Sequence, residues 1–111
     1  MTERTPMITL AIIEPLPEHV GAVEEALGAA VQAAHSEPGC ELYALHHTSD
    51  EPVRFVMVEQ WADADALTAH MEGDGIKALL PALAGKVVGA PQILRLTAIP
   101  QGDTKLGRLV P

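Results

Sequence analysis

The stretch from Arg54 to Met71 reads RFVMVEQWADADALTAHM and decides the fold, because it passes from a strand into a helix. Alternate side chains of a strand point to opposite faces. One face of this strand would carry Phe55, Met57, Glu59 and Trp61. Asp63 is a good N-cap for the helix that follows. Leu67, His70 and Met71 then recur at three- and four-residue spacing, so His70 is expected to face inward.

The residues before this stretch predict a hairpin, and before that a strand and a long helix. Residues 40–48 and 53–61 are separated by the polar turn Ser49-Asp50-Glu51-Pro52, which favours an antiparallel hairpin. Residues 7–13 are β-branched and apolar on both faces, as in a buried strand. After Pro17, apolar residues recur every three or four positions for about 18 residues, which predicts an amphipathic helix.

The residues that follow the stretch 54–71 predict another helical segment and a last strand. Gly73 and Gly75 are expected to interrupt the helix. The helical period resumes over residues 76–87, where Pro81 is expected to kink or shorten the segment. Residues 92–98 then predict a strand, because they are rich in aliphatic residues and are bounded by prolines.

The resulting order, β-α-β-β-α-β, predicts an α+β fold of ferredoxin-like type, with an antiparallel sheet and helices on one face. Residues 1–98 would form this single domain, and residues 99–111 a C-terminal tail. Three aliphatic tail residues suggest packing over the same subunit or its partner: Leu106, Leu109 and Val110. Because the sheet is apolar on both sides, a second copy is expected to cover the face that lacks helices, giving a homodimer.

The composition excludes several classes of protein. The chain has 7 Lys and Arg against 15 Asp and Glu, a net charge of −8 that argues against nucleic acid as the main partner. With 48% hydrophobic residues it is not of the disordered class. No stretch approaches the roughly 18 apolar residues of a membrane span. The N-terminus lacks the apolar run of a signal peptide and Cys40 stands alone, so the cytoplasm is the expected location.

A string of residues over most of the chain resembles a known family. The string is Pro38-Gly39-Cys40, Tyr43, Leu45-His46, Phe55, Glu59, Trp61, Asp63, Ala66-Leu67 and His70. It is similar to the antibiotic biosynthesis monooxygenase family, which includes quinol monooxygenases. The resemblance implies a dimeric α+β barrel with a cavity between sheet and helices. It also implies an enzyme that oxidises quinols or polycyclic phenols with molecular oxygen, without a metal or organic cofactor.

The resemblance carries over to individual residues. The candidate catalytic residues are His70, Trp61, Tyr43 and Glu59. In this reading Trp61 and Tyr43 hold the substrate ring, His70 takes a proton and Glu59 orients a partner. The candidate substrate-binding residues are His46, Phe55, Met57 and Met71. One position departs from the family, because the histidine that members often carry five residues after the first is replaced here by Gly75.

Structural interpretations of the same residues remain open. Trp61 would equally fill the end of the barrel, with its indole N–H bonded to the backbone. His70 beside apolar neighbours would equally be a core residue, although an imidazole is the best proton acceptor available near neutral pH. Burial would raise the pKa of Glu59 unless a group donates to it, and Tyr43 or His70 is the expected donor. No metal-binding or cofactor-binding residues are expected.

The leading functional hypothesis is therefore a cofactor-independent monooxygenase acting on a small aromatic substrate. The alternative from another class is a non-catalytic dimeric barrel that binds a small apolar ligand or acts as a stress-response or structural module. A third hypothesis, an isomerase or lyase on the same architecture, would share the pocket and show no dependence on oxygen. The oxygenase hypothesis predicts an enclosed pocket several hundred cubic ångströms in size, since an aromatic ligand needs roughly 300 Å³ or more. Side chains filling that space would contradict the hypothesis.

Overall fold

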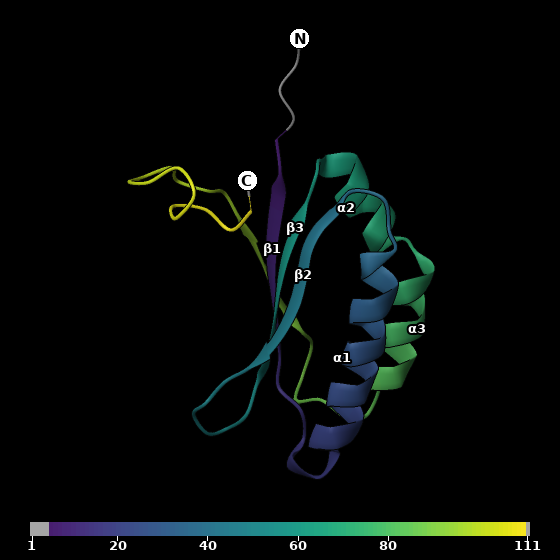
Figure 1. Ribbon diagram of the computed structural model, residues 1–111. Helices are drawn as coiled ribbons and strands as arrows, with labels where there is room; N and C mark the ends of the chain where they lie inside the picture. The colour runs from purple at the N-terminus through teal and green to yellow at the C-terminus, as the bar shows by residue number, and fades with distance from the viewer. Residues whose placement is uncertain (1–4, 111) are drawn as a thin grey trace.

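Four strands form one antiparallel sheet in the computed structural model, which describes residues 5–110 (Figure 1). The strands are β1 (Met7–Ile13), β2 (Cys40–His47), β3 (Phe55–Trp61) and β4 (Gln92–Leu96). They lie side by side in the order β2-β3-β1-β4, and every neighbouring pair is antiparallel. This order places the first and third strands at the centre, and the predicted ferredoxin-like α+β fold is confirmed.

The helices all cover one face of the sheet (Figure 1). A short 3-10 helix, η1 (Pro17–His19), leads into α1 (Val20–His35), and α2 (Ala64–Met71) and α3 (Asp74–Leu83) follow β3. α1 contacts both β2 and α3, so the two longer helices lie side by side over the sheet. Helices on only one face leave the other face of the sheet without a helical layer.

The helical region after β3 differs from the sequence-based expectation at both ends of α3. Gly75 does not interrupt the helical region, because it is the second residue of α3 and only Gly73 stands outside, as the N-cap. α3 also ends at Leu83 instead of continuing to residue 87. Pro81 lies inside it and lacks the N–H that a continuing helix needs. Val87 instead forms an isolated β-bridge with Pro15.

The hydrophobic core lies between the helices and the sheet. On the helix side it contains Val23, Leu27, Ala34, Leu67 and Leu83. On the sheet side it contains Ala11, Ile13, Tyr43, Phe55, Met57 and Trp61. The two sets follow the helical period of α1 and the alternation of β3, which is why the sequence pattern could predict them.

Two local features bring α2 close to the ends of β2 and β3. The Asp63 carboxylate accepts a hydrogen bond from the backbone N–H of Ala66 at 2.9 Å, so α2 begins at Ala64, three residues after β3 ends. Gly39, before β2, has φ +83°, and a Cβ there would lie 2.5 Å from the Ala66 side chain. Only glycine permits this approach, which holds the turn after α1 against α2.

The outer face of the sheet and the tail carry exposed aliphatic side chains. Leu94 and Leu96 of β4 are exposed on this outer face, as are Ile99 and Leu106 beyond the strand. Ile93 is also exposed, but it pairs with Ala11 and so lies on the helix-facing side. The tail leaves the sheet on the side opposite the helices (Figure 1). Near the end of the tail, the Gln60 side chain donates a hydrogen bond to the Val110 carbonyl at 3.3 Å. The domain boundary at residue 98 stays a prediction, and residues 1–4 and 111 of the predicted domain and tail lie outside the described residues.

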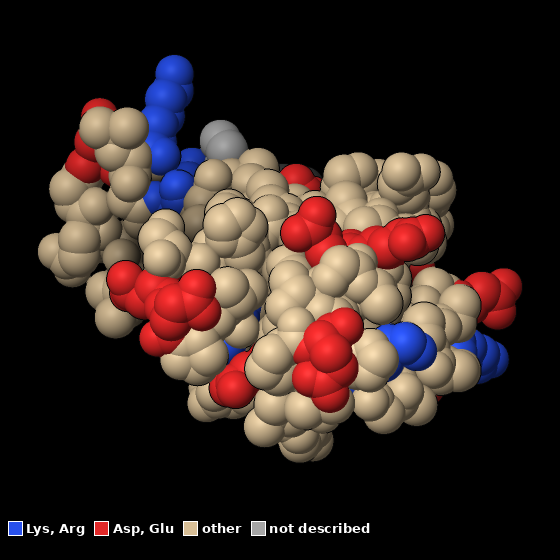
Figure 2. Space-filling model, turned by 90° about the horizontal axis from the view of Figure 1, so that it is seen from below, with Lys and Arg blue, Asp and Glu red and all other residues tan. Residues whose placement is uncertain are grey.

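The charge balance is visible on the surface. On the face shown in Figure 2, acidic side chains are spread widely and basic side chains lie mainly near the edges. Such a face favours neutral or cationic ligands over anionic ones. Within residues 5–110, no helix is both long and apolar enough to cross a membrane.

Candidate functional site

The four predicted catalytic residues meet over one end of the sheet. Glu59 and Trp61 lie on the helix-facing side of β3, Tyr43 lies opposite Glu59 on β2, and His70 comes from α2 above them. Each of the four side chains is at most 5% exposed. The strand brings residues 59 and 61 to one face because they are two positions apart. These four residues are called the ring cluster below.

Three rings pack against one another in the ring cluster. The His70 imidazole stacks on the Trp61 indole, with ring centroids 4.4 Å apart and planes inclined by 27°. Tyr43 meets both rings edge-on, at 5.2 Å from His70 and 6.1 Å from Trp61. Such offset and edge-to-face arrangements are the favoured geometries of aromatic pairs. The side chains therefore fill the space between them, and the ring cluster is closed.

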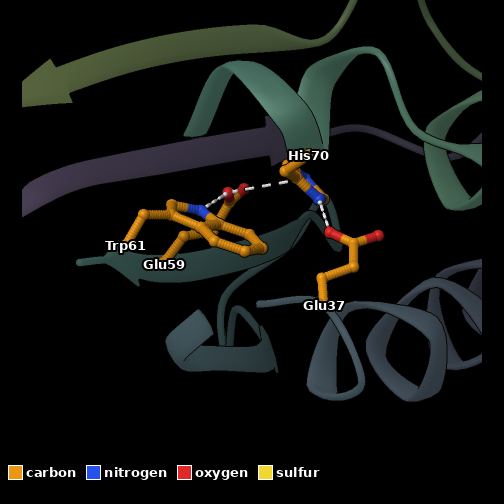
Figure 3. Close-up of polar contacts among 4 residues, drawn as sticks. All are labelled: Glu37, Glu59, Trp61 and His70. Carbon is orange, nitrogen blue, oxygen red and sulfur yellow. Dashed lines mark hydrogen bonds and ion pairs between the residues drawn. The ribbon is translucent and has the colours of Figure 1, made fainter. Parts of the chain in front are cut away.

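Two carboxylates flank the His70 imidazole (Figure 3). Nδ1 of His70 lies 2.7 Å from Oε1 of Glu37, and Nε2 lies 3.8 Å from Oε1 of Glu59. The same Glu59 oxygen accepts a hydrogen bond from the Trp61 indole N–H at 3.0 Å. A carboxylate only accepts, so Nδ1 carries the proton toward Glu37 and Nε2 of the neutral ring is the basic nitrogen.

Glu37 is the site residue that the sequence did not reveal. It stands two residues after α1, in a segment that the sequence predicts only as the end of a helix. Its contact with His70 joins residues 33 positions apart, which no local pattern predicts.

The hydrogen bond between Trp61 and Glu59 corrects two other expectations. The donor to Glu59 is Trp61, not Tyr43 or His70, and the Trp61 N–H binds a side chain instead of the backbone.

A cleft of about 640 Å³ opens beside the ring cluster. Its walls come from the C-terminal end of α1, the turn into β2, α2 and the first turn of α3. Glu37 and His70 both line it. The expected enclosed pocket between sheet and helices is corrected: in the described residues the packed rings of the cluster fill that region, and the space of aromatic size is an open cleft among the helix ends.

The family is settled by a comparison of the whole sequence. The profile of the antibiotic biosynthesis monooxygenase family matches residues 6–82. The chain belongs to this family. No curated protein matches it. The matched range contains the ring cluster, Glu37 and Gly75, while β4 and the tail lie beyond it.

Several solved structures share the fold of this family member. A protein from Caulobacter crescentus, provisionally named an antibiotic biosynthesis monooxygenase, is 30% identical, with a TM-score of 0.76 over 88% of this chain and 93% of that one. A Pseudomonas aeruginosa protein is 28% identical, with a TM-score of 0.82 over 90% of this chain and 100% of that one. A Mycobacterium tuberculosis protein, at 19% identity and a TM-score of 0.81 over 89% of this chain and 100% of that one, shares the fold alone.

Two of the four predicted substrate-binding residues share the core with the ring cluster of this family member, and the other two are exposed. Phe55 and Met57 are buried in the core, farther along β3. Met71 is 45% exposed, because it follows His70 on α2 and points in another direction. His46 is exposed and pairs with Val56, so strand alternation places it on the outer face of the sheet. The structure does not bring His46 or Met71 to the site.

Burial raises the pKa of three groups at or near the site, namely Glu59, Tyr43 and Cys40. It raises the pKa of the Glu59 carboxyl, and the charge of Glu37 adds to this, while the Trp61 N–H and His70 act in the opposite direction. Burial and the nearby Glu59 and Glu37 carboxylates raise the pKa of the Tyr43 phenol, so it remains neutral. Burial also raises the pKa of the Cys40 thiol, which agrees with an unreactive cysteine. Within residues 5–110, no three acidic, histidine or cysteine side chains are grouped as metal ligands.

We expect Glu59→Gln to stabilise the protein at neutral pH. The raised pKa means that the folded chain holds the Glu59 proton more tightly than the unfolded chain. The free energy of unfolding must then fall as the pH rises from the unfolded pKa through the raised folded pKa. Glutamine carries no such proton and still accepts the Trp61 N–H. Urea unfolding between about pH 4 and 8 measures the effect. If the free energies of unfolding of the natural sequence and Glu59→Gln differ by a constant amount across that pH range, the prediction is wrong.

Proposed function

We propose that this protein is a monooxygenase that oxidises an aromatic quinol or polycyclic phenol with molecular oxygen and needs no bound cofactor. One observation carries the proposal: the buried imidazole of His70 is oriented by a 2.7 Å hydrogen bond to Glu37, at the wall of a cleft of aromatic size. A carboxylate bonded to Nδ1 fixes the tautomer in which the other nitrogen is basic. This is the arrangement of an oriented general base.

The chemistry needs one proton transfer, from the substrate to the protein. The pair formed by Glu37 and His70 accepts the proton of the substrate hydroxyl, and the resulting phenolate is electron-rich enough to reduce oxygen itself. A ring C–H becomes C=O by gaining one oxygen atom, and the other oxygen atom leaves as water, so a phenol and one O₂ give a quinone and one H₂O. The protein must also hold the substrate ring and limit the access of water to it.

Oxygen uptake by metal-stripped protein tests the proposal. The substrates are a panel of hydroquinones and anthrone-like phenols, and the autoxidation rate measured with heat-denatured protein is subtracted. We expect saturable uptake, and no release of oxygen when catalase is added, because a monooxygenase forms water and not hydrogen peroxide. Uptake no faster than autoxidation, from protein that is folded by circular dichroism, would refute the proposal.

A second candidate is a non-catalytic barrel that binds a small apolar ligand. It is favoured by the closed packing of Tyr43, Trp61 and His70, which leaves no room for a substrate between the rings. In that case the ring cluster is a structural element, and the cleft binds its ligand without any oxygen-dependent change. The oxygen-uptake experiment separates the two candidates, because only the monooxygenase consumes oxygen.

We also propose that the working unit is a homodimer formed through the sheet faces. The proposal is supported by the exposed aliphatic side chains of β4 and by the absence of helices from that side of the described chain. A sheet with an apolar outer face gains stability when a second copy covers it. Sedimentation equilibrium should give twice the mass of the 11.7 kDa chain. A concentration-independent monomer would refute the dimer.

A further inference from the structure

A second hollow of about 650 Å³ lies at one end of the sheet, between the strands and the tail. Residues 5–8, at the start of β1, and residues 95–98, at the end of β4, form its inner walls, and the tail forms its outer wall (Figure 1). None of its described lining residues belongs to the ring cluster or to the cleft beside it. This hollow is called the tail pocket below, and the proposed function makes no use of it.

The floor of the tail pocket is aliphatic. Ile8 pairs with Gln60 of β3 on one side and with Leu96 of β4 on the other, so these side chains share the outer face of the sheet. Ile8, Leu96 and Val110 line the pocket. Gln60 is 2% exposed, and its amide nitrogen already donates to the Glu41 carboxylate at 2.8 Å and to the Val110 carbonyl. An apolar ligand group therefore meets aliphatic side chains here.

The tail that forms the outer wall is a hydrogen-bonded turn. The Asp103 carboxylate accepts hydrogen bonds from the backbone N–H groups of Lys105 at 2.8 Å and of Leu106 at 3.0 Å. The backbone N–H of Gly107 donates to the Asp103 carbonyl at 2.9 Å. A Cβ at residue 107 would collide with the Gln101 carbonyl, so only glycine lets the turn close this tightly. The shape of the wall is therefore set by bonds within the tail itself.

Two arginines from different elements line the tail pocket, Arg95 on β4 and Arg108 in the tail. The Nε–H of Arg108 donates to the Thr104 carbonyl at 3.0 Å, which fixes the position of its guanidinium group. Within residues 5–110, neither arginine forms an ion pair. Asp103 is the one acidic residue among the described lining residues, and the turn already uses its carboxylate. The pocket therefore has two guanidinium groups against one carboxylate.

This local excess of positive charge contrasts with the rest of the molecule. The net charge of the chain is −8, so the molecule as a whole repels an anion. A guanidinium group has planar pairs of N–H donors that match the two oxygens of a carboxylate. The contact is also stronger in a partly enclosed, apolar hollow than in open water. Charge and shape together favour a carboxylate as the ligand of the tail pocket.

We propose that the tail pocket binds an organic carboxylate with an apolar body. The carboxylate contacts the guanidinium groups of Arg95 and Arg108, and the apolar body lies over Ile8 and Leu96. This class of ligand differs from the phenol of the proposed function, and it occupies a different part of the molecule. Binding at the tail pocket therefore does not depend on whether the protein consumes oxygen.

The test follows binding by NMR titration of the full chain, in the assembly that it forms in solution. The probes are octanoate, its neutral analogue octanamide, and acetate, which carries the charge without the apolar body. We expect octanoate to bind about tenfold more tightly than octanamide, as for a hydrogen bond between charged groups. Acetate should bind about tenfold more weakly than octanoate, because it buries little apolar surface. The shifted backbone signals should lie at residues 5–8, 95–98 and 101–108.

Arg95→Gln and Arg108→Gln test the contacts, with Lys105→Gln as the matched control. Each variant removes one positive charge from an exposed side chain at the same end of the chain, but Lys105 does not line the pocket. Each arginine variant should weaken octanoate binding by about tenfold. Lys105→Gln should weaken it by no more than about twofold, as for a screened surface charge. Circular dichroism melts check that all three variants fold.

The proposal is wrong if octanoate binds no more tightly than octanamide, or no more tightly than acetate. It is also wrong if the arginine variants weaken binding no more than Lys105→Gln does, because the tail would then attract anions only through its general charge. Octanoate binding at the tail pocket of a protein that consumes no oxygen would support this site and refute the monooxygenase proposal. Oxygen uptake without octanoate binding would have the opposite meaning.

Discussion

Replacing Trp61 by alanine should lower the free energy of unfolding by about 3–5 kcal/mol, the usual cost of removing a buried aromatic side chain. The Trp61 ring is fully buried and stacks on His70, so it joins β3 to α2. Its loss also leaves the Glu59 carboxyl without its N–H donor. A domain of this size has a total stability of roughly 5–15 kcal/mol, so the variant should be close to unfolding at 37 °C. Urea unfolding followed by circular dichroism measures the change.

Trp61→Phe is the control that separates ring packing from the hydrogen bond. It keeps an aromatic ring next to His70 but removes the indole N–H. We expect a loss of about 1–3 kcal/mol, which is the cost of leaving a buried acceptor unpaired. The loss should be larger at neutral than at acidic pH, because the ionised Glu59 needs the donor most. If Trp61→Ala and Trp61→Phe destabilise the protein equally, the stacked ring contributes nothing and this explanation is wrong.

The fold could be predicted from sequence because its signals are local. The alternation over Met7–Ile13 marks β1 with the bounds that the structure gives it. The Asp63 cap marks the start of α2 in the same way. The sequence pattern placed Glu59 and Trp61 on one strand face and turned His70 inward, and the resemblance to the family grouped these residues with Tyr43 as one site. Local periodicity therefore predicted the direction of these side chains, and the resemblance predicted their grouping.

The features that sequence could not predict depend on long-range packing. Glu37 reaches His70 only because Gly39 lets the turn after α1 approach α2 closely. Gly75 looks like a helix breaker, yet α3 includes it. A Cβ there would lie only 3.2 Å from the Cβ of Ala33 and 3.4 Å from the Glu37 carboxylate, so glycine lets α3 approach the end of α1 closely. His46 is a different case. It is three residues from Tyr43 on the same strand, and alternation alone would have placed it on the opposite face.

Replacing His70 by glutamine should lower kcat/KM for the oxygen-dependent oxidation by about 10²–10⁴-fold, the usual contribution of a general base. The glutamine amide can still donate to Glu37, but it cannot accept a proton from the substrate. The glutamine side chain largely preserves the packing beside Trp61. The fold-loss in kcat/KM should therefore be larger than any loss of stability can explain. Oxygen-uptake kinetics with the hydroquinone panel measure the first quantity, and urea unfolding measures the second.

His70→Ala distinguishes a proton acceptor from a packing residue. Alanine leaves an imidazole-sized gap against the Trp61 ring, between Glu37 and Glu59. Added imidazole should occupy this gap and restore part of the oxygen uptake in His70→Ala, but not in His70→Gln, where the gap is filled. A merely structural histidine would show no such rescue of rate beyond any gain in stability. If His70→Gln oxidises the substrate at the rate of the natural sequence, His70 is not the base, and proton removal must be assigned to Glu37 alone.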